Sequence, residues 1–211
     1  MAPLKMARTA SVLELLRRPG IAAGLMGCVL AHTGQYSLFT YIRPALESIA
    51  SLDTHGLSLM LLGFGVANFM GTMFAGWLME RSLRATLVLM PALVGVAAVG
   101  MIWLPIEGTG LTLLVALWGL AFGGVPVAWS NWVARAVPDQ AETAGGMVVA
   151  SVQSSIAAGA VMGGAVFGIG GVAGVFITAA SVMFLAALVI AIWVRVELPE
   201  HGAPARGASH I

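Results

Sequence analysis

Six long apolar stretches, separated by short polar segments, dominate the chain. They comprise residues 20–41, 57–79, 85–104, 111–133, 145–169 and 172–194. An α-helix rises about 1.5 Å per residue and needs about 20 apolar residues to cross the hydrocarbon core of a bilayer. Runs of this length without apolar/polar alternation are not typical of barrel strands, and backbone amides in lipid must be satisfied within the segment. The pattern therefore predicts an all-α integral membrane protein, a bundle of six transmembrane helices.

The composition agrees with lipid as the solvent of this bundle. Hydrophobic residues make up 59% of the 211 residues and charged residues 9%, and the mean hydropathy is +0.96. Soluble domains carry about 25% charged residues, so a water-soluble fold is excluded. The net charge of +1, without a basic patch, argues against a nucleic-acid partner. Cys28 is the single cysteine, so no intrachain disulfide forms, and neither a metal site nor a cofactor is expected.

The distribution of cations predicts the orientation of the bundle. Lys and Arg near helix ends concentrate on the cytoplasmic side of membrane proteins. Both termini are therefore expected in the cytoplasm, with residues 1–19 as an amphipathic linker along the membrane surface and residues 195–211 as a tail. The cations assigned to this side are Lys5, Arg8, Arg17, Arg18, Arg81, Arg84, Arg135, Arg195 and Arg206, whereas Arg43 is assigned to the opposite side.

Small residues recur at four-residue intervals in the second and fifth stretches. Such residues let helix backbones approach closely in lipid, where apolar burial gives little drive for association. Each stretch is the middle member of a set of three, so the recurrence favours a 3+3 inverted repeat. The positions are Gly63, Ala67, Gly71 and Ala75 in the second stretch and Ser151, Ser155, Gly159 and Gly163 in the fifth.

Acidic residues are absent from the interior of every apolar stretch. All nine lie at helix ends or outside the helices. A charge at the bilayer centre costs about 3 kcal/mol, so buried acids persist mainly where they carry ions or protons. His32 is the titratable imidazole at membrane depth, and two interpretations of it stay open. It is either a proton carrier or a neutral hydrogen-bonding residue, and the lack of a buried acid favours the second.

Aromatic and polar side chains at helical spacing mark a candidate binding region in the first and fourth stretches. Rings stack on a planar solute and amides pair with its heteroatoms, which suits a nucleoside or a drug-like molecule, and core packing is the alternative. Asn68 and Thr72 suit helix contacts and substrate contacts equally. No nucleophile–histidine arrangement or phosphate loop is present, so no enzyme activity is expected. The candidate substrate-binding residues are Gln35, Tyr36, Thr40, Trp118, Trp129 and Asn131.

Several motifs resemble those of a known family. Gly76, Leu78, Arg81 and Arg84 resemble a degenerate copy of the Gly-x-Leu-x-Asp-Arg-x-Gly-Arg loop motif of the Major Facilitator Superfamily, although the aspartate and the second glycine are missing. The runs at residues 18–20, 34–44, 118–132 and 139–145 are more specific. They are similar to the second half of drug:proton antiporter-1 family members, and the resemblance extends from about residue 15 to residue 194.

This resemblance implies the C-terminal half of a twelve-helix transporter in a bacterial inner membrane. It implies that the substrate binds between two six-helix halves and that inward proton flow drives export of purine nucleosides or related small molecules. The proton-carrying acid would then lie in a missing N-terminal half, unless a second copy of this chain completes the transporter. Export of sugars or drugs occurs on the same scaffold, and a transport-inactive fragment that acts only by association is a separate hypothesis.

Overall fold

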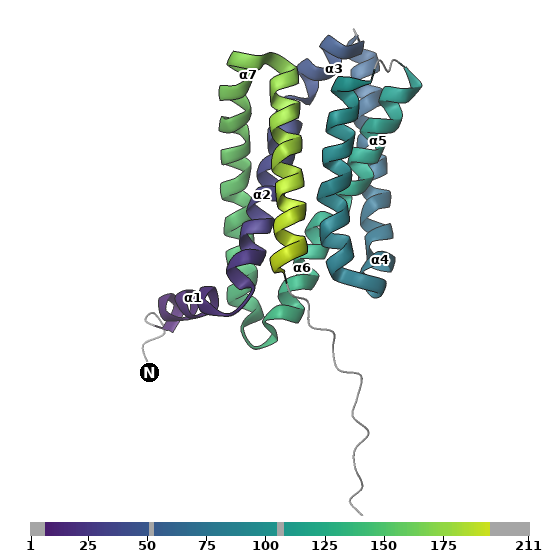
Figure 1. Ribbon diagram of the computed structural model, residues 1–211. Helices are drawn as coiled ribbons and strands as arrows, with labels where there is room; N and C mark the ends of the chain where they lie inside the picture. Colours follow the sequence, from purple (N-terminus) through teal and green to yellow (C-terminus); the bar gives the residue numbers. More distant parts are fainter. Residues whose placement is uncertain (1–6, 51–52, 105–107, 195–211) are drawn as a thin grey trace, which may run out of the picture.

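The computed structural model describes residues 7–50, 53–104 and 108–194, and within these ranges the chain is helical (Figure 1). The elements are α1 (Ala7–Arg17), α2 (Ile21–Thr40), α3 (Ile42–Ala50), α4 (Thr54–Trp103), α5 (Thr109–Gly123), α6 (Val125–Ala136), the 3₁₀ turn η1 (Pro138–Gln140) and α7 (Ala141–Trp193). Three of the described helical segments are long and apolar enough to cross a membrane: 54–103, 109–136 and 138–193. The predicted all-α membrane class is confirmed. The predicted tail at 195–211, with Arg195 and Arg206, lies outside the described residues, as does Lys5.

The two longest helices each bend once into two arms. In α4, Ser82 leaves the helical region with φ −162° and ψ 103°, and its hydroxyl accepts a hydrogen bond from the Ala85 N–H at 3.1 Å. This bond caps the second arm as an N-cap side chain does. In α7, Gly171 adopts φ 59° and ψ −154°, a conformation that glycine reaches without a Cβ clash. Figure 1 shows both helices folding back on themselves.

A short helix, α3, lies between the first two apolar stretches of the chain. α3 buries Ile42, Ala45 and Leu46, which share one helical face, while Arg43 and Glu47 form an exposed ion pair at 2.8 Å on the other. Apolar residues at i, i+3 and i+4 are sufficient for a helix of this kind when a core lies beneath them. Part of the connection between the first two apolar stretches is therefore itself helical.

The fourth predicted helix is divided into α5 and α6. The break lies at Gly124, and Pro126 follows within the first turn of α6. Proline has no N–H and interrupts the helical hydrogen-bond ladder, but it is tolerated in the first turn of a helix, where the N–H has no intrahelical partner. The chain thus continues in nearly the same direction through two short helices.

Glycines set the closest approach of helices at two crossings. At the first, a Cβ on Gly71 of α4 would lie 2.0 Å from the Leu120 carbonyl oxygen of α5. At the second, a Cβ on Gly159 of α7 would lie 2.6 Å from the Thr33 carbonyl oxygen of α2. These glycines belong to the small-residue pattern read from the sequence, and their role in close packing agrees with it. Gly63 differs, because it is exposed and no atom lies within 4 Å of its Cβ position.

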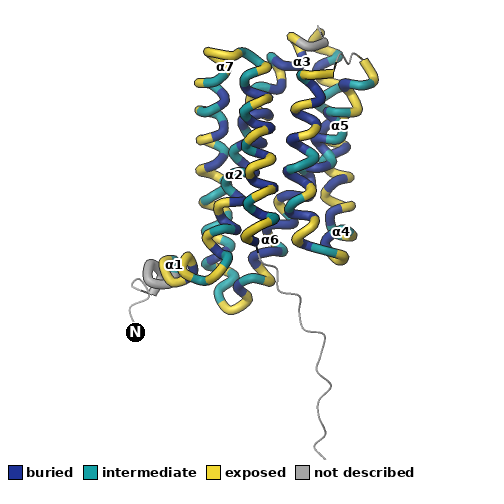
Figure 2. Tube along the Cα trace, in the orientation of Figure 1, coloured by how far each residue is buried: buried dark blue, intermediate teal, exposed yellow. Residues whose placement is uncertain are grey.

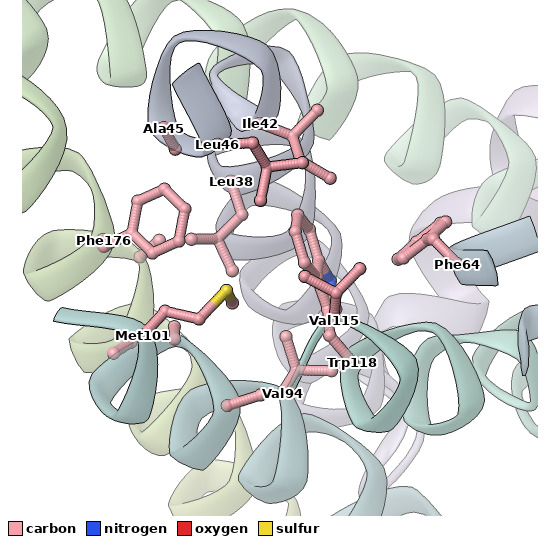
Figure 3. Close-up of a cluster of buried hydrophobic side chains, with 14 of the residues drawn as sticks. Leu38, Ile42, Ala45, Leu46, Phe64, Val94, Met101, Val115, Trp118 and Phe176 are labelled. Atoms are coloured by element: carbon pink, nitrogen blue, oxygen red, sulfur yellow. The ribbon is translucent and has the colours of Figure 1, made fainter. Parts of the chain in front are cut away.

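Two apolar clusters fill the two ends of the bundle. One surrounds Trp118 and Phe176 next to α3 (Figure 3), and the other surrounds Trp129, Trp132 and Ile190 nearer to α1. In Figure 2, α1 is largely exposed, whereas the helices of the bundle alternate between buried and exposed positions along their length. The large exposed side chains on the bundle are mainly apolar, as expected for a surface that faces lipid.

The ends of the bundle differ in charge. Figure 1 places α1, the bend at Ser82, η1 and the end of α7 at one end, and α3 and the bend at Gly171 at the other. The first end therefore carries the described cations Arg17, Arg18, Arg81, Arg84 and Arg135, and the second carries Arg43.

Candidate functional site

Gln35 and Trp118 form a buried hydrogen bond between α2 and α5. The indole Nε1 of Trp118 donates to Oε1 of Gln35 over 2.7 Å, and the two residues are 0% and 1% exposed. The Trp118 ring also packs edge-to-face against Phe64, with 5.1 Å between ring centroids. An indole N–H without a partner in an apolar interior costs about 1–3 kcal/mol, so the glutamine stabilises the tryptophan at this position. The structure brings these two predicted residues together as a core contact.

Tyr36 and Thr40 lie on the less buried side of α2. Tyr36 is half-buried and Thr40 is exposed, and the Thr40 hydroxyl donates to the Tyr36 carbonyl oxygen at 2.7 Å. The Tyr36 ring meets Phe122 of α5 edge-on, with 6.3 Å between ring centroids. Phe122 is itself half-buried, one turn after Trp118. We refer to Tyr36, Thr40 and Phe122 as the aromatic edge.

Phe122 was not among the residues selected from the sequence, although a signal for it existed. Aromatic residues and proline follow one another at positions 118, 122, 126 and 129, and only the two tryptophans of that series were chosen. Spacing alone does not say which members of such a series face the core. The structure buries Trp118 and Trp129 and leaves Phe122 partly uncovered.

His32 lies one turn before Tyr36 and is 2% exposed. Its Nδ1 lies 2.8 Å from the Cys28 carbonyl oxygen, and its ring meets Phe122 edge-on at 6.1 Å. A ring nitrogen that donates to a backbone carbonyl leaves the other nitrogen as an acceptor in the neutral tautomer. Every acidic residue that the structure describes is exposed, so none is buried beside His32. This geometry suits a neutral, hydrogen-bonded histidine.

Trp129 and Asn131 lie apart from the aromatic edge. Trp129 of α6 is 2% exposed and packs edge-to-face against Trp132 at 5.4 Å, in the apolar cluster nearer to α1. Asn131 is half-buried, and its Oδ1 accepts from Nε of Arg135 at 3.1 Å, close to the end of α6. The six predicted substrate-binding residues therefore divide between two places, Gln35, Tyr36, Thr40 and Trp118 in one and Trp129 and Asn131 in the other.

Asn68 and Thr72 of α4 bond to the backbone of α5 where that helix ends. The Thr72 hydroxyl donates to the Gly123 carbonyl oxygen at 2.8 Å, and Nδ2 of Asn68 donates to the Gly119 carbonyl oxygen at 3.3 Å. Gly123 is the last residue of α5, so its carbonyl has no donor within that helix and Thr72 supplies one, whereas Gly119 lies inside α5 and Asn68 adds a bond to a carbonyl of the helix interior. These two polar residues therefore join helices beside the break at Gly124.

Comparison with known proteins assigns the fold to a family. The family model described as Major Facilitator Superfamily matches residues 14–209, which is most of the chain. The chain belongs to the Major Facilitator Superfamily. Its relatives include proteins named purine ribonucleoside efflux pump NepI from Salmonella paratyphi B, Salmonella enteritidis PT4 and Salmonella typhimurium. Each is 38% identical over 186 residues, 88% of this chain, and the chain spans about half, 47%, of the length of each relative.

In this member of the Major Facilitator Superfamily, the residues that resemble the loop motif lie at the bend of α4. The Arg81 guanidinium stacks on Trp77 with 3.8 Å between its central carbon and the ring centroid. Arg84 donates to the Ala191 carbonyl oxygen in the last turn of α7. A cation at a helix C-terminus both satisfies a free carbonyl and opposes the negative end of the helix dipole. Gly76 is half-buried, with no atom within 4 Å of its Cβ position.

An ion pair that the sequence did not reveal joins two turns at the same end. Both terminal nitrogens of Arg18 donate to the Asp139 carboxylate, at 2.8 and 2.7 Å. These hydrogen bonds hold the pKa of Asp139 below its ordinary value and raise the pKa of Arg18. The two residues are 121 positions apart in the chain, and only the tertiary fold brings the start of α2 beside η1.

Proposed function

We propose that the chain is the C-terminal half of a proton-coupled efflux transporter for purine ribonucleosides or related small molecules. The observation that carries the proposal is the 38% identity, over 88% of this chain, to proteins named for purine ribonucleoside efflux. The matched length is about half of those relatives, which is the size of one half of a two-half transporter. Membership of a transporter superfamily agrees with this assignment.

The proposed architecture is a bundle of six spans in a bacterial inner membrane, with a linker at residues 1–19, the bundle at residues 20–194 and a tail at residues 195–211. The bends at Ser82 and Gly171 support six spans, because each divides a helix of 50 or more residues into two arms. The crossings support a 3+3 inverted repeat. In chain order, with α5 and α6 as one span, the second span (the first arm of α4) packs on the fourth (α5), and the fifth (the first arm of α7) packs on the first (α2). An inverted repeat relates spans one to three to spans four to six, so each of these two contacts is the counterpart of the other. The described cations at the end near α1 support cytoplasmic termini.

The aromatic edge is the proposed point of contact with the substrate. Tyr36 and Phe122 present ring surface for a purine, and the Tyr36 and Thr40 hydroxyls can pair with ribose hydroxyls. Gln35 and Trp118 support the edge from within the core, since their polar atoms already bond each other. Trp129 supports α6 by packing, and we assign Asn131 to the mouth of the route. His32 contributes as a neutral residue beside Phe122.

Proton coupling requires an acid at membrane depth, and the described residues place none there. The described acids are all exposed. Intramembrane acids persist where they carry protons, so the coupling acid belongs to the complementary half. That half is either an N-terminal six-helix bundle or, as the rival arrangement, a second copy of this chain.

An inosine efflux assay tests the proposal. The chain is expressed alone and together with the N-terminal half of a Salmonella relative, and efflux of labelled inosine is measured with and without a proton uncoupler. We expect efflux only from the pair, and loss of that efflux when the uncoupler is added. Efflux that survives full uncoupling contradicts proton antiport. Efflux of an arabinose-like sugar or chloramphenicol without inosine contradicts the substrate, and no efflux from any pairing favours the inactive fragment.

Two sets of variants separate contact from support. Tyr36→Phe and Phe122→Ala are expected to raise the KM for inosine about tenfold or more, while membrane insertion stays normal, because a lost hydrogen bond or stacking contact is worth about 1–2 kcal/mol. Gln35→Ala and Trp129→Ala are expected to lower the amount of inserted protein instead. The reverse outcome would assign the substrate to the buried layer.

A further inference from the structure

A groove separates α1 from the beginning of α7. α1 lies across the end of the bundle, away from the long axis of the other helices (Figure 1). Leu15 anchors it, since this side chain is 0% exposed within the apolar cluster nearer to α1. Away from Leu15, the two helices leave a space of about 540 Å³ between them. Its lining consists of Val12 from α1 and of Glu142, Thr143, Gly146, Met147 and Ala150 from α7.

The chemistry of this lining is uneven. Val12 of α1 and Met147 and Ala150 of α7 make an apolar wall, and the two α7 residues lie about one helical turn apart. Glu142, in the first turn of α7, is the ionisable residue among the described residues of the lining, and its side chain is exposed. The ion pairs of the described residues are Arg18–Asp139 and Arg43–Glu47, so Glu142 is in neither. Among the described residues, the groove thus combines an apolar wall with one carboxylate that takes part in no described ion pair.

The position of the groove determines what can fill it. It opens where the apolar part of α7 begins, at the same end of the bundle as the cations. Leu13 and Leu16 of α1 are 57% and 39% exposed, next to the exposed Arg17, a pattern typical of a helix at a bilayer surface. When the bundle lies in a bilayer, this apolar wall is more stable in contact with acyl chains than with water.

We propose that this groove binds one phospholipid whose headgroup carries a primary ammonium group. The upper part of an acyl chain packs along Val12, Met147 and Ala150, and the ammonium donates to the Glu142 carboxylate. A charge-assisted N–H···O hydrogen bond requires N–H donors, which phosphatidylethanolamine has and phosphatidylcholine lacks. An anionic headgroup such as phosphatidylglycerol meets repulsion from the same carboxylate. The inference requires only that the chain resides in a bilayer, and it does not depend on the transported substrate.

A lipid in this groove would also affect the position of α1. α1 is fixed at its end near α2 by Leu15 and by the Arg18–Asp139 pair, while Val12 reaches α7 only across the groove. A lipid in the groove fills that gap, so it sets the position of α1 against the bundle.

Native mass spectrometry of the purified full chain tests the proposal. Phosphatidylethanolamine, phosphatidylcholine and phosphatidylglycerol with identical acyl chains are added in equal amounts to the protein in detergent micelles. We expect phosphatidylethanolamine adducts to exceed each of the others at least threefold. Glu142→Gln is expected to reduce that preference to near parity, whereas Glu80→Gln, which removes an exposed carboxylate elsewhere at the same end, is expected to leave it unchanged.

A second pair of variants tests the groove itself. No atom lies within 4 Å of a Cβ on Gly146 or on Gly145, so a larger side chain fits at either position, but only Gly146 lines the groove. Gly146→Leu is expected to lower phosphatidylethanolamine binding at least threefold, and Gly145→Leu to leave it intact, with equal helicity by circular dichroism. Equal effects of the two leucines, a preference untouched by Glu142→Gln, or stronger binding of phosphatidylglycerol would each overturn the proposal.

Discussion

The two glycine-lined crossings of the bundle use the same close approach but treat polar groups differently. Where α4 meets α5, Asn68 and Thr72 donate to carbonyl oxygens of the facing helix. Where α2 meets α7, Tyr41 stacks on Phe167 at 5.2 Å, and the buried Ser37 hydroxyl has no hydrogen-bond partner among the described residues. Side-chain hydrogen bonds to the backbone join the helices at the first crossing, whereas close van der Waals packing joins them at the second.

The difference follows from the break in the helix at Gly124. α5 ends there and leaves the Gly123 carbonyl without a donor in the helix, and Thr72 of α4 supplies one. α2 and the first arm of α7 are uninterrupted at their crossing, and their carbonyls are already satisfied within each helix. At this crossing, the contact from Thr72 is therefore placed where the helix backbone has been opened.

The largest expected effect is overpacking of the α4–α5 crossing. Gly71→Leu places a Cβ against the Leu120 carbonyl, a backbone atom that cannot rotate away, so we expect a loss of about 3 kcal/mol or more. Folded yield in membranes and thermal stability in detergent measure it. Gly63→Leu, at an open position on the same helix, serves as the control and is expected to be nearly neutral.

Overpacking of the α2–α7 crossing is expected to have a smaller effect. Gly159→Val meets the Thr33 carbonyl at a Cβ distance of 2.6 Å, which is less severe than 2.0 Å at Gly71. We expect a loss of about 1–3 kcal/mol in the same stability assay, against Gly168→Val as the control at an open position. A loss equal to or greater than that of Gly71→Leu would contradict the ranking of the two crossings.

Removing one hydroxyl from each crossing sharpens the comparison further. Thr72→Val deletes the donor to the Gly123 carbonyl and is expected to cost about 0.6 kcal/mol, with an upper value of about 1.7 kcal/mol. Ser37→Ala removes a buried hydroxyl that has no partner, so we expect no loss or a slight gain in stability. Urea or thermal unfolding in detergent distinguishes them, and equal losses would contradict the distinction.

The smallest expected effect concerns the ion pair outside the apolar layer. Because the folded state lowers the pKa of Asp139, the pair stabilises the fold above the unfolded pKa of about 4, and this contribution is lost as the pH falls through the lower, folded value. Asp139→Asn is expected to lower the Tm slightly at neutral pH and to match the parent well below pH 4. The effect is small because both groups are partly exposed to solvent. A difference in Tm that persists in acid would assign Asp139 another role.

The candidate site could be predicted only in part. The sequence was sufficient to select Tyr36, Thr40 and the aromatic series of the fourth stretch as candidates, because residue type and helical spacing are properties of the chain. The direction that each ring faces could not be predicted, because the neighbouring helices determine how a helix is rotated about its axis. Trp118 and Trp129 therefore proved to be core residues, and Phe122 emerged as the partly uncovered one.

The sequence by itself determined that the chain is helical and lies in a membrane, since long apolar runs and scarce charges leave a backbone in lipid no other way to satisfy its amides. It also indicated the transporter superfamily through short motifs. The tertiary structure alone decided which glycines are in close contact, where α3 forms, and that Arg18 meets Asp139. These features depend on contacts between residues far apart in the chain, and spacing along one helix carries no information about its partner.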